Sequence, residues 1–142
     1  MNTRIRDDLG HGDRPAAEGL VEERAFRRPD IPAVRAAAAG FGTRIGMRAT
    51  RLGDFVLAAS EAAATVVCQG PCLAKVRLWM AGRRVVCEAR GDGLLFESGP
   101  RALRRGTDAG VLRLALLERL CDHVSVESGS SGVVVRFSMA VA

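Results

Sequence analysis

Hydrophobic residues recur at three- and four-residue steps in three stretches of the chain, which predicts three helices. Asp30 favours the start of the first helix, and Pro32 fits its first turn because the N–H that a proline lacks would be unpaired there. The third helix is apolar on nearly all sides, so we expect it to be well buried. The expected helices cover residues 31–47, 52–68 and 109–121.

Elsewhere apolar and polar positions alternate, which predicts strands. In the clearest case, residues 74–80, Val76 and Leu78 share one face while Arg77 and Trp79 share the other. The expected strands cover 20–28, 74–80, 85–90, 124–126 and 133–139, with turns at 81–82 and 129–132. This order of elements predicts an α/β two-layer sandwich, in which helices cover one face of a mixed, mainly antiparallel sheet.

The domain organisation follows from where apolar residues are found. Residues 1–19 contain few of them and are expected to form a flexible tail. Residues 20–142 have the length and the apolar content of a single domain. No apolar run is long enough to span a bilayer, and the first residues lack the apolar segment of a secretory signal. We therefore expect a cytoplasmic protein.

The charge is positive but uneven. The net charge is +5, whereas residues 1–30 contain six arginines and seven acidic residues, so the remainder carries the excess. A basic domain favours either an acidic protein partner or a nucleic acid. Nucleic-acid binders usually add stacking aromatic side chains, and the five Phe and one Trp are spread over core-like positions. An acidic protein partner is favoured, and a basic nucleic-acid-binding α/β domain stays open as an alternative.

The four cysteines do not form a metal-binding pattern. Cys68 and Cys72 make one C-x₃-C pair without a second pair, and the chain has only two histidines. Cys87 falls on an expected strand and Cys121 ends an expected helix. We expect four reduced thiols and no metal site.

The second helix carries a thin polar line opposite its apolar stripe. Asp54, Glu61 and Thr65 lie on this side, and Glu61 and Thr65 are neighbours because they are four residues apart. A carboxylate and a hydroxyl held in this way could line a small-molecule site or simply face water. A threonine inside a helix also tends to bond the carbonyl four residues earlier.

Four segments resemble, in order and at the usual spacing, the motifs of a known family, the ATP-binding anti-sigma factors. These belong to the GHKL superfamily of histidine-kinase-like ATPases, which have a Bergerat-type fold. The resemblance covers roughly residues 20–140. The segments are Ser60–Glu61 with Thr65 four positions later, Gly91-Asp92-Gly93 at the end of a strand, Gly106 to Gly110 at the start of the third helix, and the closing hairpin at 120–137.

The resemblance implies roles for these positions. Glu61 falls on the general base of the family, and Thr65 falls on an asparagine that holds magnesium. Gly91 falls on the aspartate that reads adenine, which leaves Asp92 as the nearest carboxylate. The candidate nucleotide-binding residues are Thr65, Asp92, Gly93, Gly106 and Gly110.

Three departures from the family pattern fall on the same pocket. Thr65 replaces the amide ligand although magnesium requires near-ideal octahedral geometry, Gly91 removes the carboxylate, and one lid glycine beside Gly110 is missing. Losing a charge-assisted hydrogen bond such as the one to adenine costs roughly 1.5–3 kcal/mol. We therefore predict that nucleotide binding and kinase activity are lost, that Glu61 is vestigial, and that no cofactor is needed.

The function implied is regulation by protein binding. An anti-sigma-factor-like protein would bind a sigma factor, a STAS-domain anti-anti-sigma factor, or both. The resemblance also implies a homodimer, with the first helix as a contact element. The lack of a long apolar run and of clustered aromatic residues leads us to expect no membrane partner and no direct nucleic-acid partner. The main alternative is an active serine/threonine kinase that uses ATP and Mg²⁺ to phosphorylate its antagonist, with Glu61 as the base.

Overall fold

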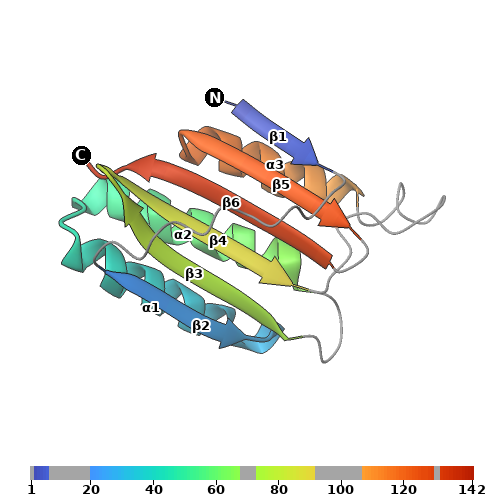
Figure 1. Ribbon diagram of the computed structural model, residues 1–142, viewed down its shortest axis with the longest axis horizontal. Coiled ribbons are helices and arrows are strands. Elements are labelled where there is room, and N and C mark those ends of the chain that lie inside the picture. Colours follow the sequence, from blue (N-terminus) through green and yellow to red (C-terminus); the bar gives the residue numbers. More distant parts are fainter. Residues whose placement is uncertain (1, 7–19, 68–72, 92–106, 130–131) are drawn as a thin grey trace.

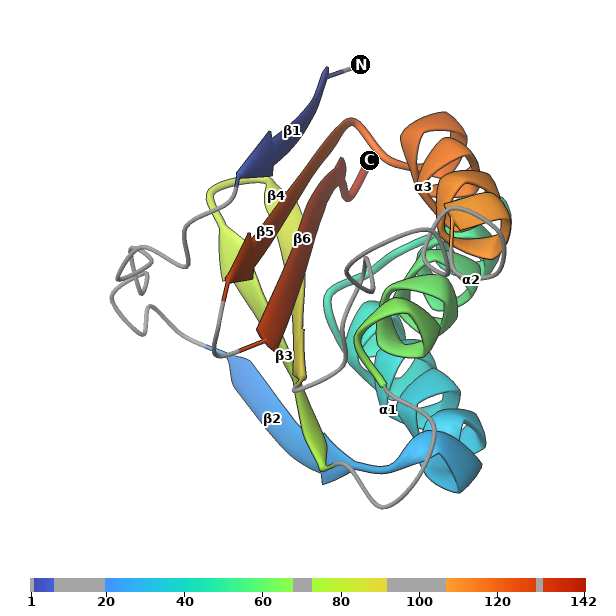
Figure 2. The same cartoon turned by 90° about the vertical axis from the view of Figure 1, so that its right-hand side faces the viewer.

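Three helices pack on one face of a six-stranded sheet, so the computed structural model has two layers (Figures 1 and 2). The structure describes residues 2–6, 20–67, 73–91, 107–129 and 132–142. α1 contacts α2, and α2 contacts α3, so the helices form one continuous layer. The expected α/β sandwich, with helices on one face of the sheet, is confirmed.

The sheet has the strand order β1-β5-β6-β4-β3-β2. Every neighbouring pair is antiparallel except β1 and β5, which are parallel. The expectation of a mixed, mainly antiparallel sheet is therefore confirmed. The strands are β1 (Asn2–Arg6), β2 (Val21–Phe26), β3 (Ala74–Ala81), β4 (Arg84–Gly91), β5 (His123–Gly129) and β6 (Gly132–Ala140).

The helices begin and end within a few residues of the expected positions. Asp30 occupies the N-cap position of α1, and Pro32 lies in the first turn. The Asp30 carboxylate does not cap the helix, because it accepts a hydrogen bond from the backbone N–H of Arg27 at 3.0 Å. The helices are α1 (Ile31–Arg44), α2 (Ala49–Val66) and α3 (Thr107–Leu120), with a short 3₁₀ turn at Arg28–Asp30.

The expected flexible tail at residues 1–19 needs a correction. Asn2–Arg6 form β1, whose register pairs Thr3 with Val124 and Ile5 with Val126. Without β1, β5 would present a free row of backbone N–H and C=O groups at the edge of the sheet. Strand pairing satisfies these groups and needs little apolar content in the added strand. Residues 7–19 lie outside the described residues.

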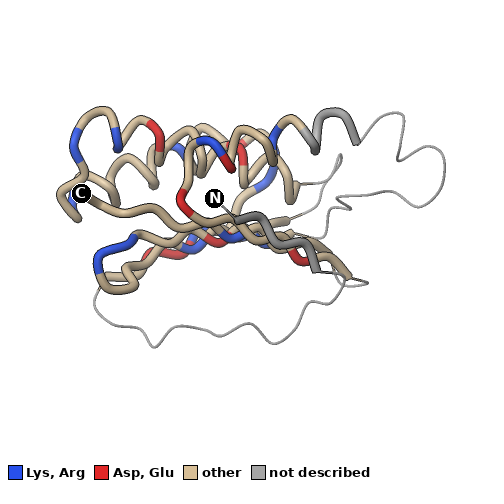
Figure 3. The backbone as a smooth tube through the Cα atoms, turned by 90° about the horizontal axis from the view of Figure 1, so that it is seen from above, with Lys and Arg blue, Asp and Glu red and all other residues tan. Residues whose placement is uncertain are grey.

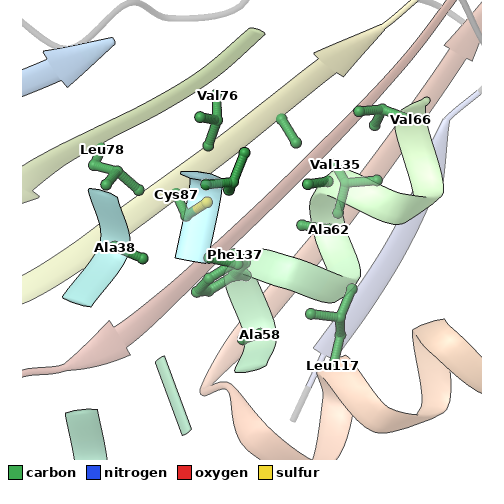
Figure 4. Close-up of a cluster of buried hydrophobic side chains, with 14 of the residues drawn as sticks. Ala38, Ala58, Ala62, Val66, Val76, Leu78, Cys87, Leu117, Val135 and Phe137 are labelled. Atoms are coloured by element: carbon green, nitrogen blue, oxygen red, sulfur yellow. The ribbon is translucent and has the colours of Figure 1, made fainter. Parts of the chain in front are cut away.

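The core lies between the sheet and α2 (Figure 4). Alternate residues of β3, β4 and β6 point toward the helices, as the period of two requires. α2 meets them with small side chains, which lets the helix approach the sheet closely. The buried residues labelled at this contact are Val76, Leu78, Cys87, Val135 and Phe137 from the sheet, and Ala58, Ala62 and Val66 from α2.

α3 is less buried than its composition predicts. Leu117 is fully buried and Leu114 nearly so, but Leu112 is 70% exposed. The reason is the position of α3 at the end of the helical layer, where its main contact is with α2. Leu112 therefore lies on a part of α3 that the contacts with α2 and β5 leave exposed.

Trp79 lies on the sheet face away from the helices, as the alternation predicts, yet it is only 4% exposed. The guanidinium carbons of Arg77 and Arg136 lie 5.8 and 5.7 Å from its ring centroid. Cation–π contact with two arginines suits a tryptophan on this face.

Among the helices in the described part of the chain, none combines the length and apolarity needed to cross a bilayer.

Candidate functional site

The polar line of α2 faces α3. Nε of Arg113 lies 3.6 Å from Oε2 of Glu61, with the two side chains 33% and 25% exposed. The candidate general base is thus partly buried and paired with a cation from the next helix. The sequence alone did not reveal this partner, because the register between two packed helices depends on their packing and not on either sequence. A carboxylate held toward Arg113 stabilises the contact between α2 and α3.

Thr65 is also engaged within its own helix. Its Oγ1 donates a hydrogen bond to the backbone carbonyl of Glu61 at 2.8 Å. This is the i−4 bond that is expected of a threonine inside a helix. The bond holds the hydroxyl against the helix backbone, whereas the asparagine of the family motif extends its amide further. The Thr65 hydroxyl therefore reaches less far from α2 than a longer amide side chain would.

The end of β4 meets the end of α2 backbone to backbone. A Cβ atom at Gly91 would lie 2.1 Å from the carbonyl oxygen of Val66 and 2.9 Å from its carbonyl carbon. Only a residue without a side chain fits such an approach. No carboxylate side chain can therefore occupy this position unless α2 or β4 moves.

The structure brings part of the predicted site together. Glu61 and Thr65 lie on the second half of α2, and Gly91 contacts its last residue, Val66. Gly110 lies in the first turn of α3. The remaining candidates, Asp92, Gly93 and Gly106, lie outside the described residues.

A separate pocket lies between β2 and α1. It has a volume of about 510 Å³ and contains none of the candidate nucleotide-binding residues. Arg44 and Glu22 form an ion pair at 2.7 Å across it. Its lining is Glu22, Arg24, Ala33, Ala36, Ala37, Gly40 and Arg44. The small residues of α1 make this side of the helix smooth.

Two of the cysteines are free, buried thiols, as expected. Burial raises the pKa of Cys121 to about 12, although the charge of Arg51 opposes the shift. Burial likewise raises the pKa of Cys87. Cys68 and Cys72 lie outside the described residues, and the part of the chain that is described holds no group of three potential metal ligands.

An ionic network ties the opposite end of α2 to the sheet. Arg51 donates from Nε to the carbonyl of Ala140 at 2.9 Å and from Nη2 to Oδ2 of Asp122 at 3.0 Å. The same oxygen accepts from the backbone N–H of Ala140 at 2.7 Å. The network joins the start of α2, the α3–β5 connection and the end of β6.

Comparison with models of known protein families gives no match, and comparison with curated proteins finds no significant relative. The function must therefore be inferred from the fold and from the geometry around α2.

Proposed function

We propose that this protein is a cytoplasmic, anti-sigma-factor-like regulator that acts by binding other proteins on a histidine-kinase-like scaffold. Its partner is a sigma factor, a STAS-domain anti-anti-sigma factor, or both. It works without nucleotide and without kinase activity. The observation that carries the proposal is the backbone contact between Gly91 and Val66.

This contact bears on the adenine end of the cleft. By resemblance, adenine would be read by a carboxylate at the end of β4, beside the helix that carries the base. In this chain the end of β4 is packed against α2, and a Cβ at Gly91 would meet the Val66 carbonyl at 2.1 Å. Real Cβ contacts are never that short in a well-packed interior. A side chain at Gly91 that could read a purine would clash with α2, which supports the proposal.

The residues that would by resemblance serve the metal and the phosphates also argue against nucleotide use. Phosphoryl transfer depends on positioning and on charge neutralisation by metal ions. The Thr65 hydroxyl is bonded to its own helix, and Glu61 is paired with Arg113. Glu61 would have to leave Arg113 before its carboxylate could act as a base, which supports a role that does not use it.

The edge of the sheet supports self-association. β2 is the last strand of the sheet, so its outer backbone edge has no partner strand among the described residues. Beside it lies the smooth side of α1, with Ala33, Ala36 and Gly40. The homodimer implied by the resemblance would use this edge together with α1.

Two measurements test the proposal. Calorimetric titration with ATP and Mg²⁺ should give no saturable heat at submillimolar protein. Tagged protein should capture a sigma factor or a STAS protein from its native cell with equal yield whether or not ATP is present. Glu61→Ala should capture the same partner, because the carboxylate plays no part in binding. ATP-dependent phosphorylation of a captured STAS protein, lost in Glu61→Ala, would show instead that the protein is a working kinase.

A further inference from the structure

Four arginines gather at one end of the molecule, where α2 begins and where the turn between β3 and β4 lies. They are Arg48 at the N-cap of α2, Arg51 in α2, Arg83 in the turn and Arg84 at the start of β4. Figure 3 shows basic positions of both layers at the end where the C-terminus lies. We call these four residues the basic end.

One carboxylate serves two of these arginines. Arg51 Nη2 lies 3.0 Å and Arg84 Nη1 lies 3.7 Å from Oδ2 of Asp122. α2 and β4 therefore each place a guanidinium group within ion-pair distance of the same carboxylate. The same oxygen also accepts the Ala140 N–H, so Asp122 is fully used in holding the fold. Asp54 of α2 is a further carboxylate close to Cys121, so four guanidinium groups still outnumber the nearby carboxylates and leave a local excess of positive charge.

The other two arginines are exposed and have no ion-pair partner in the described part of the chain. Arg83 is the second residue of a two-residue hairpin loop whose first residue, Gly82, has a φ of +62°. Glycine favours this position in such turns because other residues rarely adopt a positive φ. The turn therefore presents Arg83 at the tip of the hairpin.

Arg48 stands where the helix would be more stable with another residue. It occupies the N-cap of α2 with φ −81° and ψ 162°, the extended geometry that an Asp or Ser cap adopts. No side chain caps the helix, and its first turn has no acidic residue. A cation beside the positive end of a helix dipole is unfavourable. A residue that breaks a local rule of stability points to a function at that site.

We propose that the basic end binds an acidic segment of a partner protein. The inference deepens the proposed function, on which it rests for the nature of the partner. Guanidinium groups bind carboxylates through paired, charge-assisted hydrogen bonds, and complementary charge speeds association. A protein is favoured over a nucleic acid because, among the described residues, no exposed aromatic side chain accompanies the four arginines, and the one tryptophan is buried on the sheet.

The test uses a fluorescent peptide of eight glutamates and a random duplex DNA of twenty base pairs as probes, with binding followed by anisotropy at low salt. Arg48→Asp combined with Arg83→Glu should weaken peptide binding about tenfold or more. Arg28→Asp combined with Arg35→Glu makes the same change in net charge near the start of α1. Both of these arginines are exposed. This control should change peptide binding less than about twofold.

Arg48→Asp alone gives a second readout that damage to the fold cannot mimic. It should raise the midpoint of thermal unfolding, because aspartate caps α2, while it weakens peptide binding. Equal loss in the control pair, or no saturable peptide binding by the native protein, would overturn the inference. Tighter binding of the DNA, lost in the same variant, would also overturn it and identify a nucleic acid as the occupant.

The proposed function and this inference can fail separately. If the Arg48→Asp, Arg83→Glu variant captures a native partner equally well, the proposed regulatory function is supported, but the basic end is not its docking surface. If no native partner is captured but the peptide binds at the basic end, the binding of an acidic segment is supported and the anti-sigma-factor-like function is contradicted.

Discussion

Gly91 and Val66 bring β4 and α2 into direct backbone contact, since a Cβ on the glycine would lie 2.1 Å from the valine carbonyl oxygen. Gly91 is the last residue of β4, and Val66 is the last residue of α2. One glycine therefore sets how closely the helix approaches the sheet. The same approach leaves no room for a side chain at the end of β4 unless α2 or β4 moves.

Gly91→Ala should lower the free energy of unfolding by about 1–3 kcal/mol, because overpacking against backbone forces α2 or β4 to shift. Gly53 provides a matched control, since it lies exposed on α2 and a Cβ there would meet nothing within 4 Å. Gly53→Ala should raise stability by up to about 1 kcal/mol, as alanine is the better helix former. Urea denaturation measures both variants, and equal stability of the two would contradict the contact.

Acid should weaken the network at Asp122. Burial alone would raise the pKa of Asp122, but the Ala140 N–H and the Arg51 guanidinium lower it, and the net pKa is below the ordinary value. A lowered pKa stabilises the folded state above the unfolded pKa of about 3.9, and this contribution is lost as the pH falls through the folded-state value.

Asp122→Asn should therefore lower the free energy of unfolding by about 1 kcal/mol at pH 7, a modest value because the carboxyl is partly exposed. The difference from the native protein should shrink below about pH 4. Urea denaturation at pH 7 and pH 3 measures it. Glu118→Gln is the control, since Glu118 has no ion-pair partner in the described residues. A difference that stays constant with pH would show that charge at Asp122 is irrelevant.

The buried thiols should react only when the protein unfolds. The thiolate is the reactive form, and burial holds the pKa of Cys121 at about 12. In a Cys68→Ser, Cys72→Ser background, Cys87 and Cys121 should react with an aromatic disulfide reagent at pH 8 at least about a hundredfold more slowly than in guanidinium. Thr43→Cys in the same background places a thiol at an exposed helix position, where it should react at once. Comparable rates for the native and added thiols would contradict the burial.

The sequence was sufficient for features that depend on neighbours along the chain. The alternation of Val76 and Leu78 with Arg77 and Trp79 predicts which side of β3 faces the helices. The core between sheet and helices confirms it, because it contains the first two residues and neither of the others. The bond from Thr65 to the Glu61 carbonyl was foreseen for the same reason, since both partners lie on one helix. Periodicity and local hydrogen bonding are properties of a short segment.

Features that depend on distant segments could not be predicted. β1 forms because β5 has a free edge, and strand pairing leaves little trace in the paired sequence. The exposure of Leu112 depends on how many elements surround α3. The ion pair between Glu61 and Arg113 and the steric closure at Gly91 depend on how α2 packs against α3 and β4. The sequence spacing therefore named the candidate residues, whereas the contacts that they make depend on packing.

The proposed homodimer can be tested at the edge formed by β2 and α1. Antiparallel pairing of two β2 strands about Glu23 would place Glu22 of each copy opposite Arg24 of the other. Arg24 is exposed and has no ion-pair partner among the described residues, so this pairing would supply one. Light scattering should therefore give a molar mass of twice the 15.1 kDa of one chain.

Gly40→Trp should convert the dimer to a monomer. A Cβ at Gly40 meets nothing within 4 Å, so the folded chain can accept a side chain there, but the indole would fill the groove beside β2. Gly53→Trp adds the same side chain to an equally open position on α2 and should leave the dimer intact. A native protein that is monomeric at tens of micromolar would exclude the dimer. A Gly40→Trp variant that remains a dimer would place the contact between copies elsewhere, because a tryptophan at Gly40 cannot coexist with two closely paired α1 helices.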